Sequence, residues 1–106
     1  MKRARQATAR RPGNSGLDVL LRLQARLEAE GFRVTMHLLA PGTTFQAHCP
    51  CEPRIDVVFS GLLKVVIEDE ERLLGPGDWQ RVPAGVSMSA EVVGDEPVLG
   101  FDAVRD

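Results

Sequence analysis

The sequence predicts an all-β barrel or jelly roll that is preceded by a single α-helix. Apolar residues first recur at helical spacing and then, after Gly31, gather in short runs rich in β-branched residues. Eight such runs follow in about 75 residues, with no helical pattern between them. A closed barrel or jelly roll suits this arrangement better than an open sheet, because closure leaves few unpaired strand edges.

The helix is predicted over residues 17–30. Leu17, Leu20 and Leu27 recur at helical spacing, and Ser15 to Asp18 resembles a capping box with Asp in place of Glu. Gly31 supplies the C-terminal stop. The apolar stripe of this helix is expected to pack on the same domain.

Each predicted strand is bounded by glycine, proline or an acidic turn. The strands are expected at residues 32–40, 43–48, 55–60, 62–68, 71–74, 79–82, 86–93 and 98–104.

Length and charge indicate one small domain. The chain has 106 residues, 43% of them hydrophobic, which suits a single domain over residues 16–106. Residues 1–16 hold five of the 13 basic residues and no acidic residue, whereas the other 90 hold eight basic and all 15 acidic residues. Residues 1–15 are expected to form a flexible basic tail. Because the rest of the chain is acidic and would repel phosphates, no nucleic-acid partner is expected.

The sequence predicts a cytoplasmic protein with no membrane partner. It lacks both an apolar run of 18 or more residues and the apolar segment of a signal peptide. Cys49 and Cys51 are spaced C-x-C, and residues two apart on an extended chain cannot easily form a disulfide. Reduced thiols fit a cytosolic protein.

Glycine and proline landmarks point to a known family. Gly42 lies six positions before His48, Gly61 follows the next predicted strand, and Gly77 precedes the Pro83-Ala84-Gly85 turn. In this spacing the chain resembles a small single-domain cupin, with an RmlC-like jelly roll over residues 33–104. The resemblance implies a cupin double-stranded β-helix with one N-terminal α-helix.

The metal motifs of that family are degenerate in this chain. Family members with the full pattern hold a divalent metal by two histidines and a glutamate from the first motif and a histidine from the second. His48 matches the first histidine, but Pro50, Arg54 and Met88 stand at the other three positions. Proline offers no ligand atom, and a guanidinium repels a cation.

The segment Gln46-Ala47-His48-Cys49-Pro50-Cys51-Glu52 leaves two interpretations open. His48, Cys51 and Met88 could form a softer ligand set for zinc, copper or iron. Alternatively, both cysteines are ordinary loop residues and Met88 fills the barrel.

For the strand over residues 55–60, hydrophobicity and the family resemblance predict different inward-pointing residues. Ile55, Val57 and Phe59 alternate with Arg54 and Asp56, so hydrophobicity alone would turn the charged pair outward. The cupin resemblance instead places Arg54 inward. Both hold if the apolar set faces a second layer, either the helix or another subunit, which makes a homodimer the expected assembly. Arg54 and Asp56 would then pair at the cavity mouth and recognise an anion or a polar molecule.

Three further residues receive a predicted place. Gln46 shares strand parity with His48 and is expected to line the same cavity. His37 is expected to be a satisfied or surface side chain, and Trp79 is expected in the barrel core.

Two functions follow from these predictions. The first is a small cupin that binds a small polar or anionic metabolite in its barrel. Its predicted ligand-binding residues are Gln46, His48, Arg54, Asp56 and Met88. The alternative is a metal-dependent cupin enzyme of isomerase, oxygenase or lyase type, in which His48, Cys51 and Glu52 are catalytic.

Overall fold

A computed structural model describes residues 14–105, which form one helix and eight strands. The helix, α1 (Asn14–Ala29), begins three residues before the predicted start at residue 17 and ends one residue before its predicted end. Gly31 follows with a φ of 96°, a conformation that suits glycine and ends the helix as predicted. Most of the predicted basic tail, residues 1–13, lies outside the described residues.

The eight predicted strands are all present, and each end lies within two residues of its prediction. They are β1 (Phe32–Leu39), β2 (Thr44–His48), β3 (Arg54–Ser60), β4 (Leu62–Ile67), β5 (Glu70–Leu74), β6 (Trp79–Val82), β7 (Met88–Val93) and β8 (Val98–Arg105).

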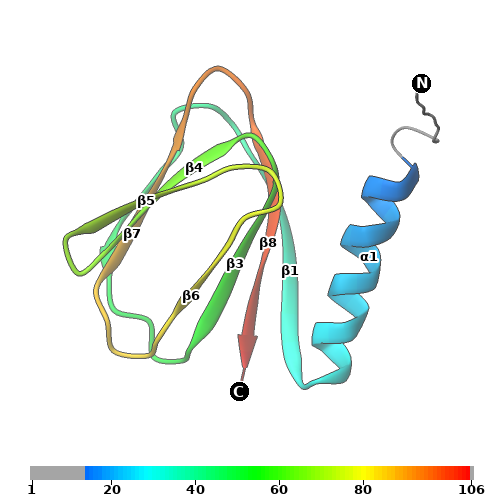
Figure 1. Cartoon of the computed structure of the whole chain (residues 1–106). Helices are drawn as coiled ribbons and strands as arrows, with labels where there is room; N and C mark the ends of the chain where they lie inside the picture. Colours follow the sequence, from blue (N-terminus) through cyan, green and yellow to red (C-terminus); the bar gives the residue numbers. More distant parts are fainter. Residues whose placement is uncertain (1–13, 106) are drawn as a thin grey trace.

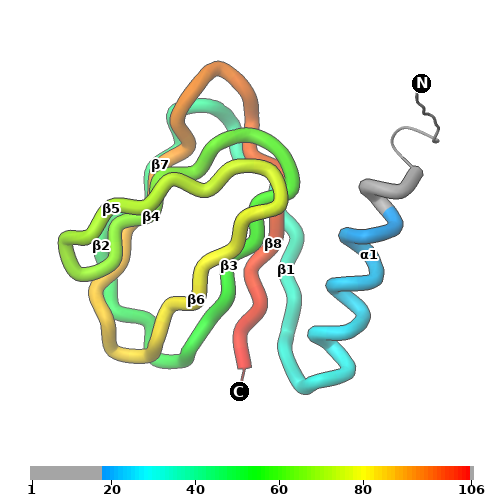
Figure 2. The backbone as a smooth tube through the Cα atoms, in the orientation of Figure 1, coloured from blue at the N-terminus to red at the C-terminus, as the bar shows by residue number. Residues whose placement is uncertain are grey.

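The strands form two four-stranded antiparallel sheets that face each other, with strand orders β1-β8-β3-β6 and β2-β7-β4-β5. Figure 2 shows the backbone running back and forth between these two walls. The helix lies outside the barrel, beside β1 (Figure 1). The predicted all-β jelly roll with one N-terminal helix is confirmed.

Two apolar layers are separated by the sheet that contains β3. The inner layer lies between the two sheets and consists of aliphatic side chains and one methionine: Val58, Leu63, Val65, Leu74, Val82, Met88, Val92 and Val98. The outer layer joins Leu20 and Leu27 of α1 to Val57, Phe101 and Ala103. Partly buried Ile55 and Phe59 also pack there.

This outer layer determines which face of β3 points into the barrel. Alternate residues of a strand point to opposite faces, so Ile55, Val57 and Phe59 share one face, which packs in the layer with α1. Arg54 and Asp56 therefore point into the barrel. The helix supplies the second layer that the sequence required.

Glycine takes a left-handed conformation at the predicted barrel turns. Gly61, between β3 and β4, has a φ of 88°, and a Cβ at this position would overlap the carbonyl oxygen of Pro97. Gly77 has a φ of 89° and donates its N–H to Val58 O at 2.9 Å. Only glycine adopts such angles without a steric penalty, so these residues fix the turns that close the barrel.

One residue departs from its predicted place on the barrel. Trp79, predicted in the core, is 60% exposed. It opens β6, at the opposite edge of its sheet from β1, and pairs with Val57 of β3, whose side chain is on the outer face. Because α1 lies beside β1, Trp79 is beyond the part of that face that the helix covers. The prediction of a core tryptophan was wrong.

Exposed apolar side chains lie on other parts of the described surface as well. Leu38 of β1 is 71% exposed, and Met36 is also exposed.

The homodimer that the sequence predicts stays a prediction. The described helix falls short of the length and hydropathy that a membrane span requires.

Candidate functional site: the barrel cavity

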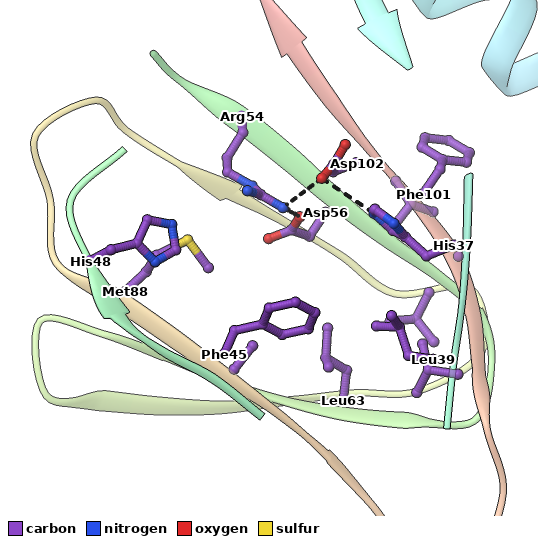
Figure 3. A pocket seen from close by; sticks show the side chains of 15 residues that line it. His37, Leu39, Phe45, His48, Arg54, Asp56, Leu63, Met88, Phe101 and Asp102 are labelled. Carbon is purple, nitrogen blue, oxygen red and sulfur yellow. Dashed lines mark hydrogen bonds and ion pairs between the residues drawn. The ribbon is translucent and has the colours of Figure 1, made fainter. Parts of the chain in front are cut away.

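A cavity of about 130 Å³ lies between the two sheets. Six of the eight strands contribute side chains to it, and most of these side chains are apolar (Figure 3). The lining residues are His37, Leu39, Phe45, His48, Arg54, Asp56, Val57, Val58, Leu63, Met88, Ala90, Val98, Gly100, Phe101 and Asp102.

Strand register brings the charged residues to one wall of the cavity. Asp56 of β3 is paired directly with Asp102 of β8, so the two carboxylates lie side by side on the inner face. Like charges in this position repel each other. Arg54, two residues before Asp56 on the same face, places a guanidinium between them (Figure 3).

The guanidinium of Arg54 makes three hydrogen bonds. Its Nε and Nη2 atoms both donate to Oδ1 of Asp56, at 3.1 and 2.6 Å, and Nη2 also donates to Oδ2 of Asp102 at 2.9 Å. The Nε2 atom of His37, on β1, lies 3.2 Å from the same Asp102 oxygen. We call these four residues, His37, Arg54, Asp56 and Asp102, the ion network.

Asp56 is the most deeply buried member of the ion network, at 7% exposure. Its burial raises the pKa of the carboxyl group above the model-compound value of 3.8, although the charge and hydrogen bonds of Arg54 act in the opposite direction. Both Arg54 donors meet Oδ1, so among the described residues Oδ2 of Asp56 has no hydrogen-bond partner. A buried carboxylate oxygen in this state is costly unless a ligand or water supplies a donor.

An irregular strand shapes the opposite side of the cavity. Strict alternation would put Phe45 and His48 on different faces of β2, yet both line the cavity. A shift of register between these two residues explains this, because it changes which face the following residue takes. Gln46, predicted to line the cavity, is instead exposed and is not among the lining residues.

His48 and Met88 meet at the cavity as the sequence suggested. They are paired across β2 and β7, and Figure 3 shows the Met88 sulfur next to the imidazole. The Nδ1 atom of His48 lies 3.1 Å from the carbonyl oxygen of Gln46. Met88 is buried in the inner apolar layer.

The other residues of the predicted catalytic and metal sets lie elsewhere. Cys49 and Cys51 are exposed, are not joined by a disulfide and do not line the cavity. Glu52 also stands outside the cavity lining and faces Arg33, with 3.5 Å between the carboxylate and the guanidinium.

The donor set does not fit the metal that the fold family implies. Within residues 18–105, no group of three or more His, Cys, Asp or Glu side chains is arranged to hold a metal ion. Arg54, at the position where the cupin resemblance implies a glutamate ligand, instead places a cation in the cavity wall.

The sequence analysis did not identify Asp102, and it did not predict that His37 lines the cavity. Asp102 was not singled out, although an aspartate within the apolar run Val98–Arg105 is an available signal. His37 was expected to be a satisfied or surface side chain. It does have a partner, but that partner belongs to the cavity wall. Only the pairing of β8 with both β1 and β3 brings these residues together.

Comparison with known proteins gives matches among solved structures only. No family model matches the sequence, and no curated protein does. A conserved protein of unknown function from Streptococcus pyogenes superposes with a TM-score of 0.65 at 21% identity, over 72% of this chain and 65% of its own. An RmlC-like cupin from Shewanella frigidimarina gives a TM-score of 0.63 at 18% identity, over 70% of this chain and 65% of its own.

A third structure is the Cupin_2 domain of an XRE family transcriptional regulator from Enterobacter cloacae. Its TM-score is 0.64 at 26% identity, over 74% of this chain and 85% of its own. The chain thus spans just under two thirds of the first two structures and most of the third. These likenesses establish the fold.

Proposed function

This chain has the RmlC-like cupin fold, and we propose that it is a binding module whose barrel cavity holds a small molecule with an apolar body and one polar head group. One observation carries the proposal. Among the described residues, one oxygen of the buried Asp56 carboxylate has no hydrogen-bond partner, and it faces a cavity that is otherwise mostly apolar. Small-molecule sites typically have such an apolar lining with a few polar groups that orient the ligand.

The cavity limits the size of the body. Its volume is about 130 Å³, and an engineered apolar cavity of about 150 Å³ in another protein takes up benzene. A body of about six carbon atoms is therefore the appropriate size. Leu39, Leu63 and Ala90 surround such a body, and Figure 3 shows the Phe45 ring beside Leu63.

The ion network favours a hydrogen-bond donor over the anion that the sequence also allowed. An anion needs a free cation, and Arg54 already donates three hydrogen bonds to two carboxylates. Oδ2 of Asp56 is instead an acceptor to which no described residue donates a hydrogen bond. Of the two ligand classes predicted, the polar molecule is the one that we propose.

A binding role is favoured over the enzyme alternative on the positions of the side chains. An enzyme that uses His48 with Cys51 and Glu52 needs these groups around one reacting atom. Only His48 lines the cavity. The Enterobacter cloacae structure is a domain of a transcriptional regulator, which is a setting in which a cupin-fold domain need not catalyse a reaction.

The proposal is tested by filling the cavity. Ala90 on β7 lines the cavity, so Ala90→Phe places a ring where the body of the ligand would lie. The control is Ala25→Phe, because Ala25 is exposed on α1, outside the barrel. Benzyl alcohol, which has an aromatic body and a hydroxyl donor, is the probe, and two-dimensional amide NMR is the readout.

We expect benzyl alcohol to shift the amide signals of cavity residues in the wild type and in Ala25→Phe. Ala90→Phe should weaken binding at least about tenfold, because the added ring takes up the space of the probe. A packed core adjusts only partly to such an insertion. The smaller Ala90→Val serves if the phenylalanine variant does not fold. Shifts confined to the outer surface, or equal binding by a folded cavity variant, would refute the proposal.

A further inference from the structure

We propose that the head group bound at this site is an organic cation, such as a primary ammonium, held by the free oxygen of Asp56. This inference rests on the proposed function and adds the chemical class of the ligand. The observations that carry it are the charges and hydrogen bonds of the ion network.

The cavity wall holds one negative charge more than it holds fixed positive charges. Two carboxylates, Asp56 and Asp102, face it, and Arg54 is the one permanently charged cation among its lining residues. His37 and His48 also line the cavity, and each adds a positive charge only when it is protonated. For the fixed charges alone, a monocation would bring the wall to neutrality.

Among the described residues, each carboxylate has one oxygen without a hydrogen-bond partner, Oδ2 of Asp56 and Oδ1 of Asp102. Asp56 is the more deeply buried of the two, with its side chain 10% exposed against 16% for Asp102. Asp102 shares its Oδ2 between Arg54 and His37, at 2.9 and 3.2 Å. Arg54 takes only Oδ1 of Asp56. In Figure 3 the second oxygen of Asp56 points away from Arg54 and Asp102 into the cavity, toward the space between Met88 and Phe45.

Burial favours a charged donor at this oxygen. Charge-assisted hydrogen bonds are roughly twice as strong as neutral ones. The raised pKa of Asp56 shows that burial already opposes its ionised form, and an added cation would offset that cost. A neutral hydroxyl would satisfy the geometry but leave the charge uncompensated.

The apolar lining defines the rest of the ligand. A hydrated metal ion or free ammonium would leave Leu39, Leu63 and Ala90 without contacts. An alkyl or aryl amine fills that space and places its nitrogen at Asp56. The inferred class is thus a small amine with an apolar body.

The test compares three probes that share one ring and differ in the head group. They are benzylamine, benzyl alcohol and benzoate, each titrated against the full chain at neutral pH with amide NMR shifts as the readout. We expect benzylamine to bind at least about tenfold more tightly than benzyl alcohol, and benzoate to bind most weakly.

Asp56→Asn keeps the shape of the side chain and removes its charge, so it should abolish the preference for benzylamine over benzyl alcohol. Asp95→Asn is the matched control, because Asp95 is exposed in the turn between β7 and β8. It should leave the preference unchanged. If Asp56→Asn does not fold, the ranking of the three probes by the wild type still decides the question.

The outcomes separate the two proposals. Binding of benzyl alcohol in the cavity with no preference for benzylamine would overturn the cationic head group and leave the binding function standing. Tighter binding of benzoate would also overturn it. Failure of all three probes to bind in the cavity would remove both proposals.

Discussion

Removal of the Arg54 side chain tests the ion network most sharply. Arg54→Met keeps much of the aliphatic length but leaves Asp56 and Asp102 side by side without the cation between them. Breaking a buried ion pair by removing one partner costs about 3 to 5 kcal/mol. The Arg54 side chain is 22% exposed and Asp56 can take up a proton, so we expect a loss of about 2 to 4 kcal/mol near neutral pH.

The cost should depend on pH in a definite direction. Burial already raises the folded-state pKa of Asp56 above 3.8, and loss of Arg54 should raise it further. A carboxyl group with a raised folded-state pKa stabilises the fold below its unfolded pKa, and that contribution is lost as the pH rises through the folded pKa. The variant should therefore lose stability as the pH rises above about 4, and the loss relative to wild type should shrink toward acid.

Urea unfolding at several pH values measures this effect. Arg72→Met is the matched control, because Arg72 pairs with Glu70 two residues away on one strand, at 3.2 Å and with both side chains exposed. We expect it to cost less than about 1 kcal/mol at every pH. Adding Asp56→Asn to Arg54→Met should restore part of the lost stability. An Arg54→Met cost below about 0.5 kcal/mol, or one independent of pH, would refute the reasoning.

Three further changes test the frame around the cavity by unfolding free energy. Gly100→Ala should cost about 3 kcal/mol or more, since its Cβ would overlap a carbonyl oxygen of β3; a cost below about 1 kcal/mol would contradict that close packing. Glu68 and Asp69, at the β4–β5 turn, have φ values of 50° and 67°, so Glu68→Asn with Asp69→Gly should stabilise the protein by about 1 kcal/mol, and a loss would argue against the strained turn. Leu20→Ala on the buried face of α1 should cost about 2 to 5 kcal/mol, whereas exposed Leu21→Ala should change stability by about 0.5 kcal/mol or less; equal effects would mean that the helix does not dock as described.

The sequence predicted the fold well because its signals are local. Glycines such as Gly61 and Gly77 mark turns that require positive φ, and short apolar runs between them mark strands. Strand ends move by only a residue or two when pairing adjusts them. Trp79 was misplaced because hydrophobicity does not tell which part of a sheet face a single helix covers.

The candidate site was predicted only in part, for physical reasons that single residues illustrate. Alternation within β3, combined with the family resemblance, was enough to predict that Arg54 and Asp56 point into the barrel. Asp102 joins them only through the register of β3 with β8, which is not encoded in either strand alone. Gln46 was misassigned because the irregularity in β2 changes strand parity after Phe45.

A crystal structure of the protein with benzylamine tests the account most directly. We expect the ring to lie between the two sheets, among the apolar residues of the cavity, and the nitrogen to lie about 3 Å from Oδ2 of Asp56. Density for the ring on the outer surface only, or a nitrogen that points away from Asp56, would contradict the proposed mode of binding.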